Sequence, residues 1–318
     1  MRGWKCPEQC QSGKFKFETP IPATPGDSVY DFIFKCSRNV SSKHSGSWIK
    51  WSDDLPTLNL EDDVPFGSIT VPTKITASLN YFLKNNIAHN MPTLICGPTG
   101  TGKSVCVQNV LNVQLDRLKF DSIKMGFSAK TTCNMAQNIV DGKLEKIRKG
   151  VYGPVPGKRM VLFVDDFNMP EREIYGAQPP LELMRQLMGS SGWFDLKDKT
   201  WRTIVKTTLV AAMGPPGGGR NMISPRVLRH MSLVCLPEAD EASLSRIFSF
   251  IVNRHLSMYK FESSVARMGN QIVEATTEIF REARKTLLPT PAKSHYLFNL
   301  RDLARVVQGI IMVRSVRV

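Results

Sequence analysis

One stretch decides the fold: Leu94-Ile-Cys-Gly97-Pro-Thr-Gly100-Thr-Gly102-Lys103-Ser104. It joins an apolar strand to a glycine-rich turn and to a Lys-Ser pair that opens a helix, with the spacing G-x-x-x-x-G-K-[ST]. In such a loop the main-chain N–H groups converge on phosphates, and the helix N-terminus adds partial positive charge. The stretch therefore predicts a polyphosphate site in an α/β fold, in preference to a solvent-exposed glycine turn.

Two side chains of this loop have predicted roles. We expect Lys103 to hold the β- and γ-phosphates and Ser104 to ligate Mg²⁺. The motif therefore predicts a polyphosphate ligand together with Mg²⁺. The predicted nucleotide-binding residues of the loop are Gly97, Pro98, Thr99, Gly100, Thr101, Gly102, Lys103, Ser104 and Val105.

Two acids follow a second apolar run. Met160–Val164 is followed directly by Asp165 and Asp166, so both carboxylates are expected at the carboxyl edge of a buried strand, where open α/β sheets bind ligands. We expect Asp165 to orient Mg²⁺ through its water shell and Asp166 to polarise the attacking water. The alternative is that Asp166 and Asn168 merely begin a loop.

Short apolar runs alternate with helical segments from Pro92 onward. The runs are continuous, which is typical of parallel strands covered on both faces by helices. Because one run lies between the loop strand and the Asp165 strand in sequence, we expect at least one strand between these two in the sheet. This favours ATPases with an added strand over simple nucleotide kinases. The predicted strands are Thr93–Cys96, Ile123–Phe127, Met160–Val164, Thr208–Met213 and Met231–Leu236.

The sequence divides into three predicted regions. Residues 1–65 are rich in Pro, Ser, Asp and Gly and are expected to form an irregular lead-in with few regular elements, anchored by Trp48 and Trp51. Residues 66–238 form the α/β core, and residues 239–318 form an incomplete helical lid. The lid helices are expected at Glu241–Leu256, at Ser264–Leu287 and from Asn299 onward, with Asn299 as N-cap and Asp302 as first-turn acid.

Charge and composition narrow the function classes. The 318-residue chain has a formal net charge of +14, but its basic residues are dispersed, and the densest stretch, residues 143–159, has Tyr152 as its main aromatic residue. A solvated helix face or an interface with an acidic neighbour is the main interpretation, and nucleic-acid binding is the alternative. No apolar stretch approaches the length of a membrane span, and the N-terminus has no signal-peptide core, so we expect an intracellular protein.

The cysteines predict neither a disulfide framework nor a metal site. Cys96, Cys106 and Cys235 are three of the seven cysteines and fall inside apolar runs, where a small apolar side chain is sufficient. Cys6 and Cys10 with Cys36 or His44 are a candidate zinc set, but no second close-spaced pair completes it.

A second glycine-rich loop follows the strand predicted at Thr208–Met213. It runs from Gly214 to Arg220 and contains three consecutive glycines, but no Lys-[ST] pair follows. A loop that moves or packs tightly is therefore favoured over a second phosphate cradle. Further on, Arg229 precedes a strand, and a basic residue at such an edge can reach the phosphates of a neighbouring protomer, although an isolated arginine there is usually a surface residue.

Several runs together resemble one family. The chain is similar to axonemal dynein heavy chains, at the third of the six AAA+ modules of the motor ring. The resemblance extends from about residue 28 to the end of the chain. The matching runs are Thr70-Val-Pro-Thr73, Gly97-Pro-Thr-Gly-Thr-Gly-Lys-Ser104, Phe127-Ser-Ala129, Lys149-Gly-Val-Tyr-Gly-Pro154, Phe163-Val-Asp-Asp-Phe-Asn-Met-Pro170, Tyr175-Gly-Ala-Gln-Pro-Pro180, Ala212-Met-Gly-Pro-Pro-Gly-Gly-Gly-Arg-Asn221, Arg229-His230 and Leu297-Phe-Asn-Leu-Arg-Asp-Leu303.

The resemblance implies a fold and a cellular role. The fold is a P-loop AAA+ core, with a five-stranded parallel sheet between helices, followed by a partial α-helical lid. The implied cofactors are ATP or ADP with Mg²⁺, bound between the core and the lid. The role is part of a minus-end-directed microtubule motor that moves cilia or flagella, located in the cytoplasm, the cytoskeleton and the axoneme. The implied partners are neighbouring AAA+ modules, and, only through the full-length motor, intermediate and light chains and microtubules. Neither nucleic acid nor a membrane is expected.

The resemblance also assigns further residues. Thr70, Val71 and Pro72 are expected near the adenine, and Arg301 is expected to act as the sensor that closes on the γ-phosphate. Arg229 resembles the finger that is presented in trans to the site of the preceding module. The match begins inside the relatives and ends inside the lid, so the chain is expected to be a fragment or a short isoform.

Departures from the family pattern predict slow hydrolysis. Asp166 stands where many AAA+ ATPases have glutamate, and Gly214 stands where a polar sensor is common. Lys74-Ile-Thr76 also lacks an acid expected in that segment. We therefore expect a slowly hydrolysing, regulatory ATP site. The alternatives are a module that holds nucleotide structurally with negligible turnover and, more remotely, a nucleic-acid-stimulated AAA+ ATPase.

Overall fold

The computed structural model describes residues 28–38, 44–56, 58, 64–293 and 295–313. The chain divides into two compact units, Met1–Leu58 and Asn59–Val318. Among the described residues, none of the helices is both long enough and apolar enough to cross a bilayer.

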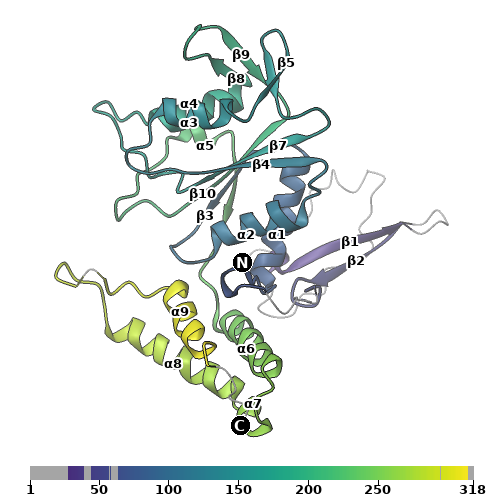
Figure 1. Ribbon diagram of the computed structural model, residues 1–318, viewed down its shortest axis with the longest axis vertical. Coiled ribbons are helices and arrows are strands. Elements are labelled where there is room, and N and C mark those ends of the chain that lie inside the picture. The colour runs from purple at the N-terminus through teal and green to yellow at the C-terminus, as the bar shows by residue number, and fades with distance from the viewer. Residues whose placement is uncertain (1–27, 39–43, 57, 59–63, 294, 314–318) are drawn as a thin grey trace, which may run out of the picture. The chain divides into compact units, whose positions relative to one another are not determined.

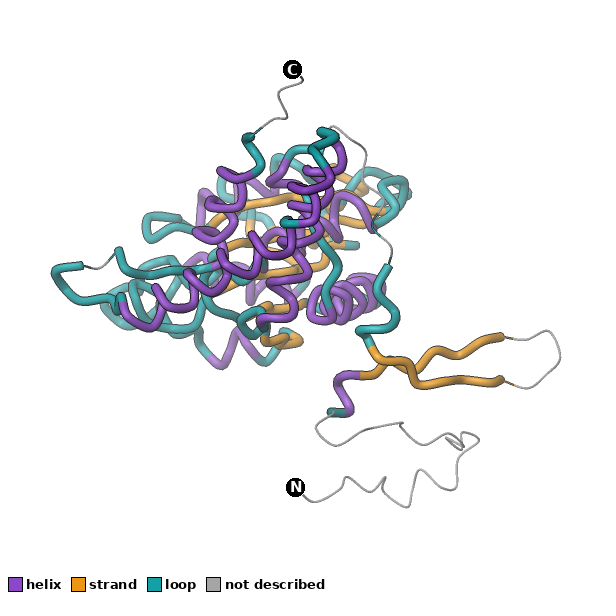
Figure 2. The backbone as a smooth tube through the Cα atoms, turned by 90° about the horizontal axis from the view of Figure 1, so that it is seen from below, coloured by secondary structure: helices purple, strands orange, loops and turns teal. Residues whose placement is uncertain are grey.

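The first unit contains a β-hairpin that the sequence analysis did not predict. Strands β1 (Phe32–Arg38) and β2 (His44–Lys50) pair antiparallel after the short 3-10 turn η2 (Val29–Asp31) (Figure 2). Trp51 is buried, and Trp48 packs edge-on against Phe34 with ring centroids 5.2 Å apart. The sequence analysis did not identify these strands, because the overall Pro, Ser, Asp and Gly content concealed the short apolar runs at residues 32–34 and 48–49.

The candidate zinc set gains no support from the described part. Cys6 and Cys10 lie outside the described residues. Cys36 and His44 lie on the two hairpin strands but are not paired with each other, since Cys36 is opposite Gly46 and His44 is opposite Arg38. The described residues contain no group of three metal-ligating side chains.

The second unit is built on a five-stranded parallel sheet with the order β11-β3-β10-β7-β4 (Figure 1). All five predicted strands are present and parallel. One strand does lie between the loop strand β3 and the Asp165 strand β7, but it is β10. Strand β4, which prompted that prediction, lies at the edge beyond β7. The strand bounds are β3 (Thr93–Cys96), β4 (Phe120–Gly126), β7 (Arg159–Asp165), β10 (Thr207–Met213) and β11 (Ser232–Cys235).

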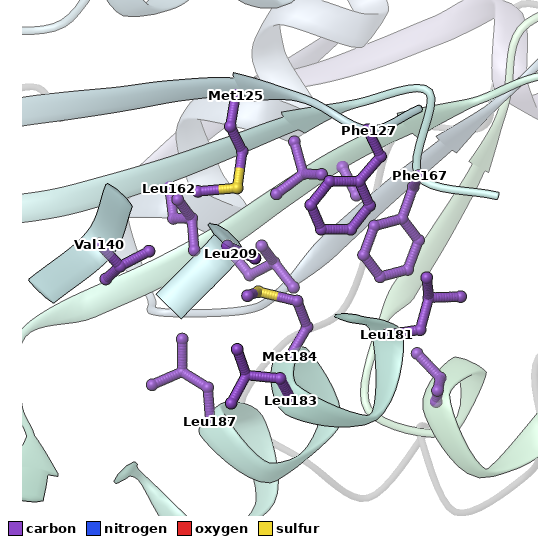
Figure 3. Close-up of a cluster of buried hydrophobic side chains, with 14 of the residues drawn as sticks. Met125, Phe127, Val140, Leu162, Phe167, Leu181, Leu183, Met184, Leu187 and Leu209 are labelled. Carbon is purple, nitrogen blue, oxygen red and sulfur yellow. The ribbon is translucent and has the colours of Figure 1, made fainter. Parts of the chain in front are cut away.

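Helices cover both faces of this sheet (Figure 1). Alternate residues of β7 and β10 enter opposite clusters, so Leu162 and Leu209 pack on one face and Val161 and Val210 on the other. Figure 3 shows the first cluster, in which Phe127 stacks on Phe167 at 5.9 Å. The first face is covered by α3 (Cys133–Asp141), α4 (Pro179–Ser190) and α5 (Pro225–Leu228), and the second by α1 (Lys74–Ala88), α2 (Lys103–Asn109) and the π-helical turn η4 (Val110–Gln114).

A smaller four-stranded sheet contains the basic stretch. Its order is β5-β6-β9-β8, so the expected solvated helix face is instead a pair of short strands. Arg202 pairs with Asp141 at 3.3 Å and with Asp195, and its guanidinium lies 4.7 Å from the ring centroid of Tyr152. One face of that ring is therefore already occupied. The bounds are β5 (Glu145–Arg148), β6 (Val151–Gly153), β8 (Gly192–Phe194) and β9 (Trp201–Ile204).

The lid is helical, as predicted. Asn299 caps α9 and exchanges hydrogen bonds with Asp302, because Asn299 N–H donates to Asp302 Oδ2 at 3.0 Å while the Asn299 side chain accepts from the first turn. The helix predicted over Ser264–Leu287 is divided at Met268. The helices are α6 (Glu241–Met258), α7 (Ser263–Arg267), α8 (Gly269–Thr286) and α9 (Leu300–Ile310), and the short turn η3 (Phe66–Ser68) precedes the core.

Candidate functional site

The glycine-rich loop between β3 and α2 is fixed at both ends. At its start the Gly97 N–H donates to Met213 O at 3.2 Å, and a Cβ at Gly97 would collide with the main-chain oxygen of Leu236. At its end Gly102 has a φ of +82°, a left-handed conformation that side chains with a Cβ disfavour, and it directly precedes the first helical residue, Lys103. Close packing therefore requires glycine at position 97, and backbone conformation favours it at position 102.

The loop forms a cradle of unpaired donors around the Lys103 ammonium. Lys103 Nζ donates to the main-chain oxygens of Gly97 at 2.7 Å and Pro98 at 2.5 Å. By contrast, the main-chain N–H groups of residues 100–103 donate to no other residue that the structure describes. Free N–H groups at a helix start beside a cation are suited to an anion such as a phosphate.

The two acids lie at the same sheet edge as the loop. Parallel pairing places Val164 beside Ala211 and Met213 beside Cys96, so the carboxyl ends of β3, β10 and β7 are neighbours. Asp166 has a φ of +50°, and its N–H donates to Asp165 Oδ1 at 3.0 Å. A left-handed aspartate directly after a buried strand is a strained conformation of the kind that is common at functional sites.

Electrostatics connect the two halves of the site. Burial lowers the pKa of Lys103, and the charge of Arg220 lowers that pKa further, whereas the carboxylates of Asp165 and Asp166 raise it. These groups therefore lie within electrostatic range of one another. The strand register places the acids and the loop at one edge of the sheet, and the roles of these residues stay predictions.

Arg220 is a site residue that the sequence analysis left without a role. Its Nη2 lies 3.8 Å from Asp166 Oδ1, and it is reached through the second glycine-rich loop. Asn168, expected in the alternative interpretation only to begin a loop, is fully buried, and its Nδ2 donates to Gly214 O at 2.9 Å. The sequence does place this arginine directly after three glycines, where the backbone can turn back sharply. It does not show in which direction the arginine side chain then points.

Residues of the lid lie next to the glycine-rich loop. A cavity of about 280 Å³ is lined by Pro98–Thr101 of the loop and by lid residues that include Phe298 and Asn299. A Cβ at Gly100 would lie 2.8 Å from Asn299 Oδ1, so the start of α9 touches the loop. Arg301 follows in the first turn of α9, where its N–H donates to Asn299 Oδ1 at 2.8 Å.

The other predicted site residues lie on or next to helices of the α/β core. Thr70, Val71 and Pro72 directly precede Thr73, the N-cap of α1, and α1 packs with α2 on one face of the sheet. Ser104 is half-buried and Val105 is exposed in the first turn of α2. Arg229 is exposed at the end of α5, where its Nε lies 3.2 Å from Nε2 of the adjacent His230. Their roles stay predictions.

The residues fit a nucleotide with a divalent cation. Ser104 and Asp165 supply hard oxygen donors beside the cradle, and Mg²⁺ typically takes only one or two protein ligands, since it keeps waters and binds substrate phosphates. The free N–H groups and the Lys103 ammonium supply the complementary charge for phosphate oxygens.

Comparison with known proteins agrees with this geometry. A family model described as the P-loop containing dynein motor region matches residues 58–239. The chain belongs to this dynein motor-region family. A second model, described as an AAA+ lid domain, matches residues 272–318. Membership of the dynein motor-region family implies a nucleotide-binding AAA+ ATPase fold.

The similar dynein chains are much longer than this one. Dynein axonemal heavy chain 12 of Rattus norvegicus is 44% identical over 286 residues, which are 90% of this chain and 9% of the relative. Dynein axonemal heavy chain 3 of Homo sapiens is 44% identical over 289 residues, covering 90% of this chain and 7% of the relative. Dynein axonemal heavy chain 1 of Homo sapiens is 41% identical over 285 residues, covering 86% and 7%. The chain thus corresponds to less than a tenth of each of these dyneins.

Proposed function

We propose that this chain is an ATP-binding, slowly hydrolysing AAA+ module with a regulatory role, equivalent to the third module of an axonemal dynein ring. The observation that carries the proposal is the cradle itself. The N–H groups of residues 100–103 are free, and the Lys103 ammonium lies in the field of Asp165 and Asp166 at one sheet edge.

Binding replaces contacts that the cradle makes within itself. Lys103 leaves the oxygens of Gly97 and Pro98 for the β- and γ-phosphates, and the free N–H groups take phosphate oxygens. Thr70, Val71 and Pro72 contact the adenine, and Arg301 moves with the lid toward the γ-phosphate. Because Asn299 already touches Gly100, a small change at the loop is transmitted directly to α9.

Hydrolysis requires the two acids. When bound, Mg²⁺ neutralises charge that develops between the β- and γ-phosphates. Ser104 ligates this ion, Asp165 orients its water shell, and Asp166 accepts a hydrogen bond from the attacking water. The carboxylate of Asp166 is one methylene shorter than that of glutamate, so activation of the water is weak. The same shortening favours the second candidate, a module that holds nucleotide with negligible turnover.

The cellular role follows from the relatives. Their names describe axonemal dynein heavy chains, so we infer a place in a microtubule motor of cilia or flagella, in the axonemal cytoskeleton. Neighbouring AAA+ modules are the direct partners. Arg229 is proposed to serve the site of the preceding module, while intermediate chains, light chains and microtubules are reached only through the full-length motor.

The test is titration of the 318-residue chain with Mg·ATP. We expect the parent to bind and Lys103→Ala to lose about a hundredfold or more in affinity, since an ammonium between two phosphates makes strong charge-assisted hydrogen bonds. Lys143→Ala removes an exposed lysine outside the site and is the matched control. Equal binding by the parent and Lys103→Ala, with the fold intact by circular dichroism, would overturn the proposal.

A further inference from the structure

The second glycine-rich loop turns Arg220 back toward the sheet. Gly217, Gly218 and Gly219 have φ values of +119°, +57° and +85°, and Gly217 and Arg220 exchange main-chain hydrogen bonds of 3.0 and 3.1 Å. A Cβ at Gly214 would lie 2.6 Å from Arg220 Nε and 2.8 Å from its Cδ. The arginine side chain therefore occupies the space that any larger residue at position 214 would fill.

The guanidinium of Arg220, at the end of this turn, has N–H donors that are not used in close hydrogen bonds. Its Nη2 approaches Asp166 only to 3.8 Å, and its Nε is buried with no hydrogen-bond partner among the described residues. Arginine presents five N–H donors in a planar fork that matches phosphate oxygens. The same charge lowers the pKa of Lys103, and β10, which leads into the loop of Arg220, lies beside β3, which leads into the loop of Lys103.

We propose that Arg220 contacts the γ-phosphate in cis and takes the place of the polar side chain that is absent at Gly214. This inference rests on the proposed nucleotide site. In the structure, Nη2 of Arg220 lies near Asp166 Oδ1. When ATP is bound, its γ-phosphate carries more negative charge than one half-exposed carboxylate and offers oxygens in a bidentate arrangement, so the guanidinium turns to it. Asp166 is then released to the attacking water.

A purely structural role for Arg220 makes a different prediction. If Arg220 only braces the glycine loop, its removal changes stability and affects the binding of every nucleotide to the same extent. A contact to the γ-phosphate instead affects nucleoside triphosphates and leaves diphosphates unchanged. The ratio of the two dissociation constants separates these roles, whatever the absolute affinities are.

The experiment measures binding of ADP and of the non-hydrolysable triphosphate AMPPNP, each with Mg²⁺, to the 318-residue chain. In Arg220→Ala we expect the ratio of the AMPPNP Kd to the ADP Kd to rise about tenfold or more, as for the loss of a charge-assisted hydrogen bond. Gly214→Ala keeps the arginine but displaces it, and should raise the ratio in the same direction. Arg220→Lys should restore part of the preference. Arg226→Ala removes an exposed arginine of α5 and should leave the ratio unchanged.

The outcomes distinguish failure of the role proposed for Arg220 from failure of the proposed nucleotide site. If the parent binds both nucleotides and the ratio stays constant in Arg220→Ala and Gly214→Ala, the role of Arg220 is refuted and the nucleotide site stands. If the parent binds neither nucleotide, both proposals fail. Should Arg220→Ala not fold by thermal denaturation, Gly214→Ala supplies the answer, because the backbone at Gly214 is not in the left-handed region.

Discussion

Two glycine-rich loops leave adjacent parallel strands at the same edge of the sheet, and they end in different ways. The loop after β3 leads into a helix, so its N–H groups at residues 100–103 remain free. The loop after β10 closes on itself through Gly217 and Arg220 and directs a guanidinium inward. Glycine content therefore does not define a phosphate cradle. The deciding property is whether the main-chain donors are left for a ligand.

The two loops also need their glycines for different reasons, and the largest expected effect tests this. Gly97→Ala places a Cβ against the rigid main chain of Leu236, so we expect a loss of about 2–4 kcal/mol in the free energy of unfolding and weaker nucleotide binding. Denaturant unfolding measures the first and Mg·ATP titration the second. A stability within roughly 0.5 kcal/mol of the parent, the range of ordinary surface substitutions, would contradict this contact.

The second-largest expected effect is on ATP turnover and concerns Asp166, the acid near Arg220 of the second loop. Asp166→Asn keeps the shape of the side chain but accepts hydrogen bonds from water less strongly, so we expect ATP turnover at this site to fall about tenfold. Steady-state hydrolysis is measured on an assembled motor that carries the substitution in this module. Asp198→Asn, at an exposed position, is the control. An unchanged rate with Asp166→Asn would favour the module that holds nucleotide without turnover.

A glycine of the second loop should be less costly to replace than Gly97. Gly218 has a φ of +57°, and a Cβ added there would meet no other atom within 4 Å, so Gly218→Ala costs only the left-handed backbone, about 1 kcal/mol. Gly218→Asn tolerates that conformation better and should recover part of the loss. Denaturant unfolding of both variants decides, and a loss equal to that of Gly97→Ala would mean that the loop packs against other groups.

Much of the core could be predicted from sequence because its signals are local. Continuous apolar runs such as Met160–Val164 marked strands covered on both faces, and Asn299 with Asp302 marked the start of α9. The strand order was harder, since position in a sheet depends on contacts between distant segments. Thus β10, late in the sequence, lies between β3 and β7.

The features that sequence reasoning did not predict share one physical cause. Each depends on a contact between residues that the sequence alone does not identify. Arg220 was assigned no role, since only the fold shows that Gly214 leaves room for its side chain. The basic stretch was interpreted as a solvated helix face or an interface with an acidic neighbour, and the helix is wrong, since residues 145–148 pair with residues 151–153 as strands. The hairpin of β1 and β2 was overlooked for the same reason, since strands are stabilised by cross-strand pairs.

The smallest expected effect comes from the titration of Lys103, which distinguishes the first loop from the second. Burial and Arg220 lower the pKa of this ammonium, and bound phosphates stabilise its charged form. Nucleotide affinity should therefore be constant while Lys103 is protonated and fall as pH rises through the lowered pKa, beginning below the ordinary lysine value of about 10.4. Mg·ATP titration across alkaline pH measures this decline. In Lys103→Arg the charge persists at every pH tested, so the decline should disappear even if binding is weaker, and a decline of the same size there would assign the titration to another group.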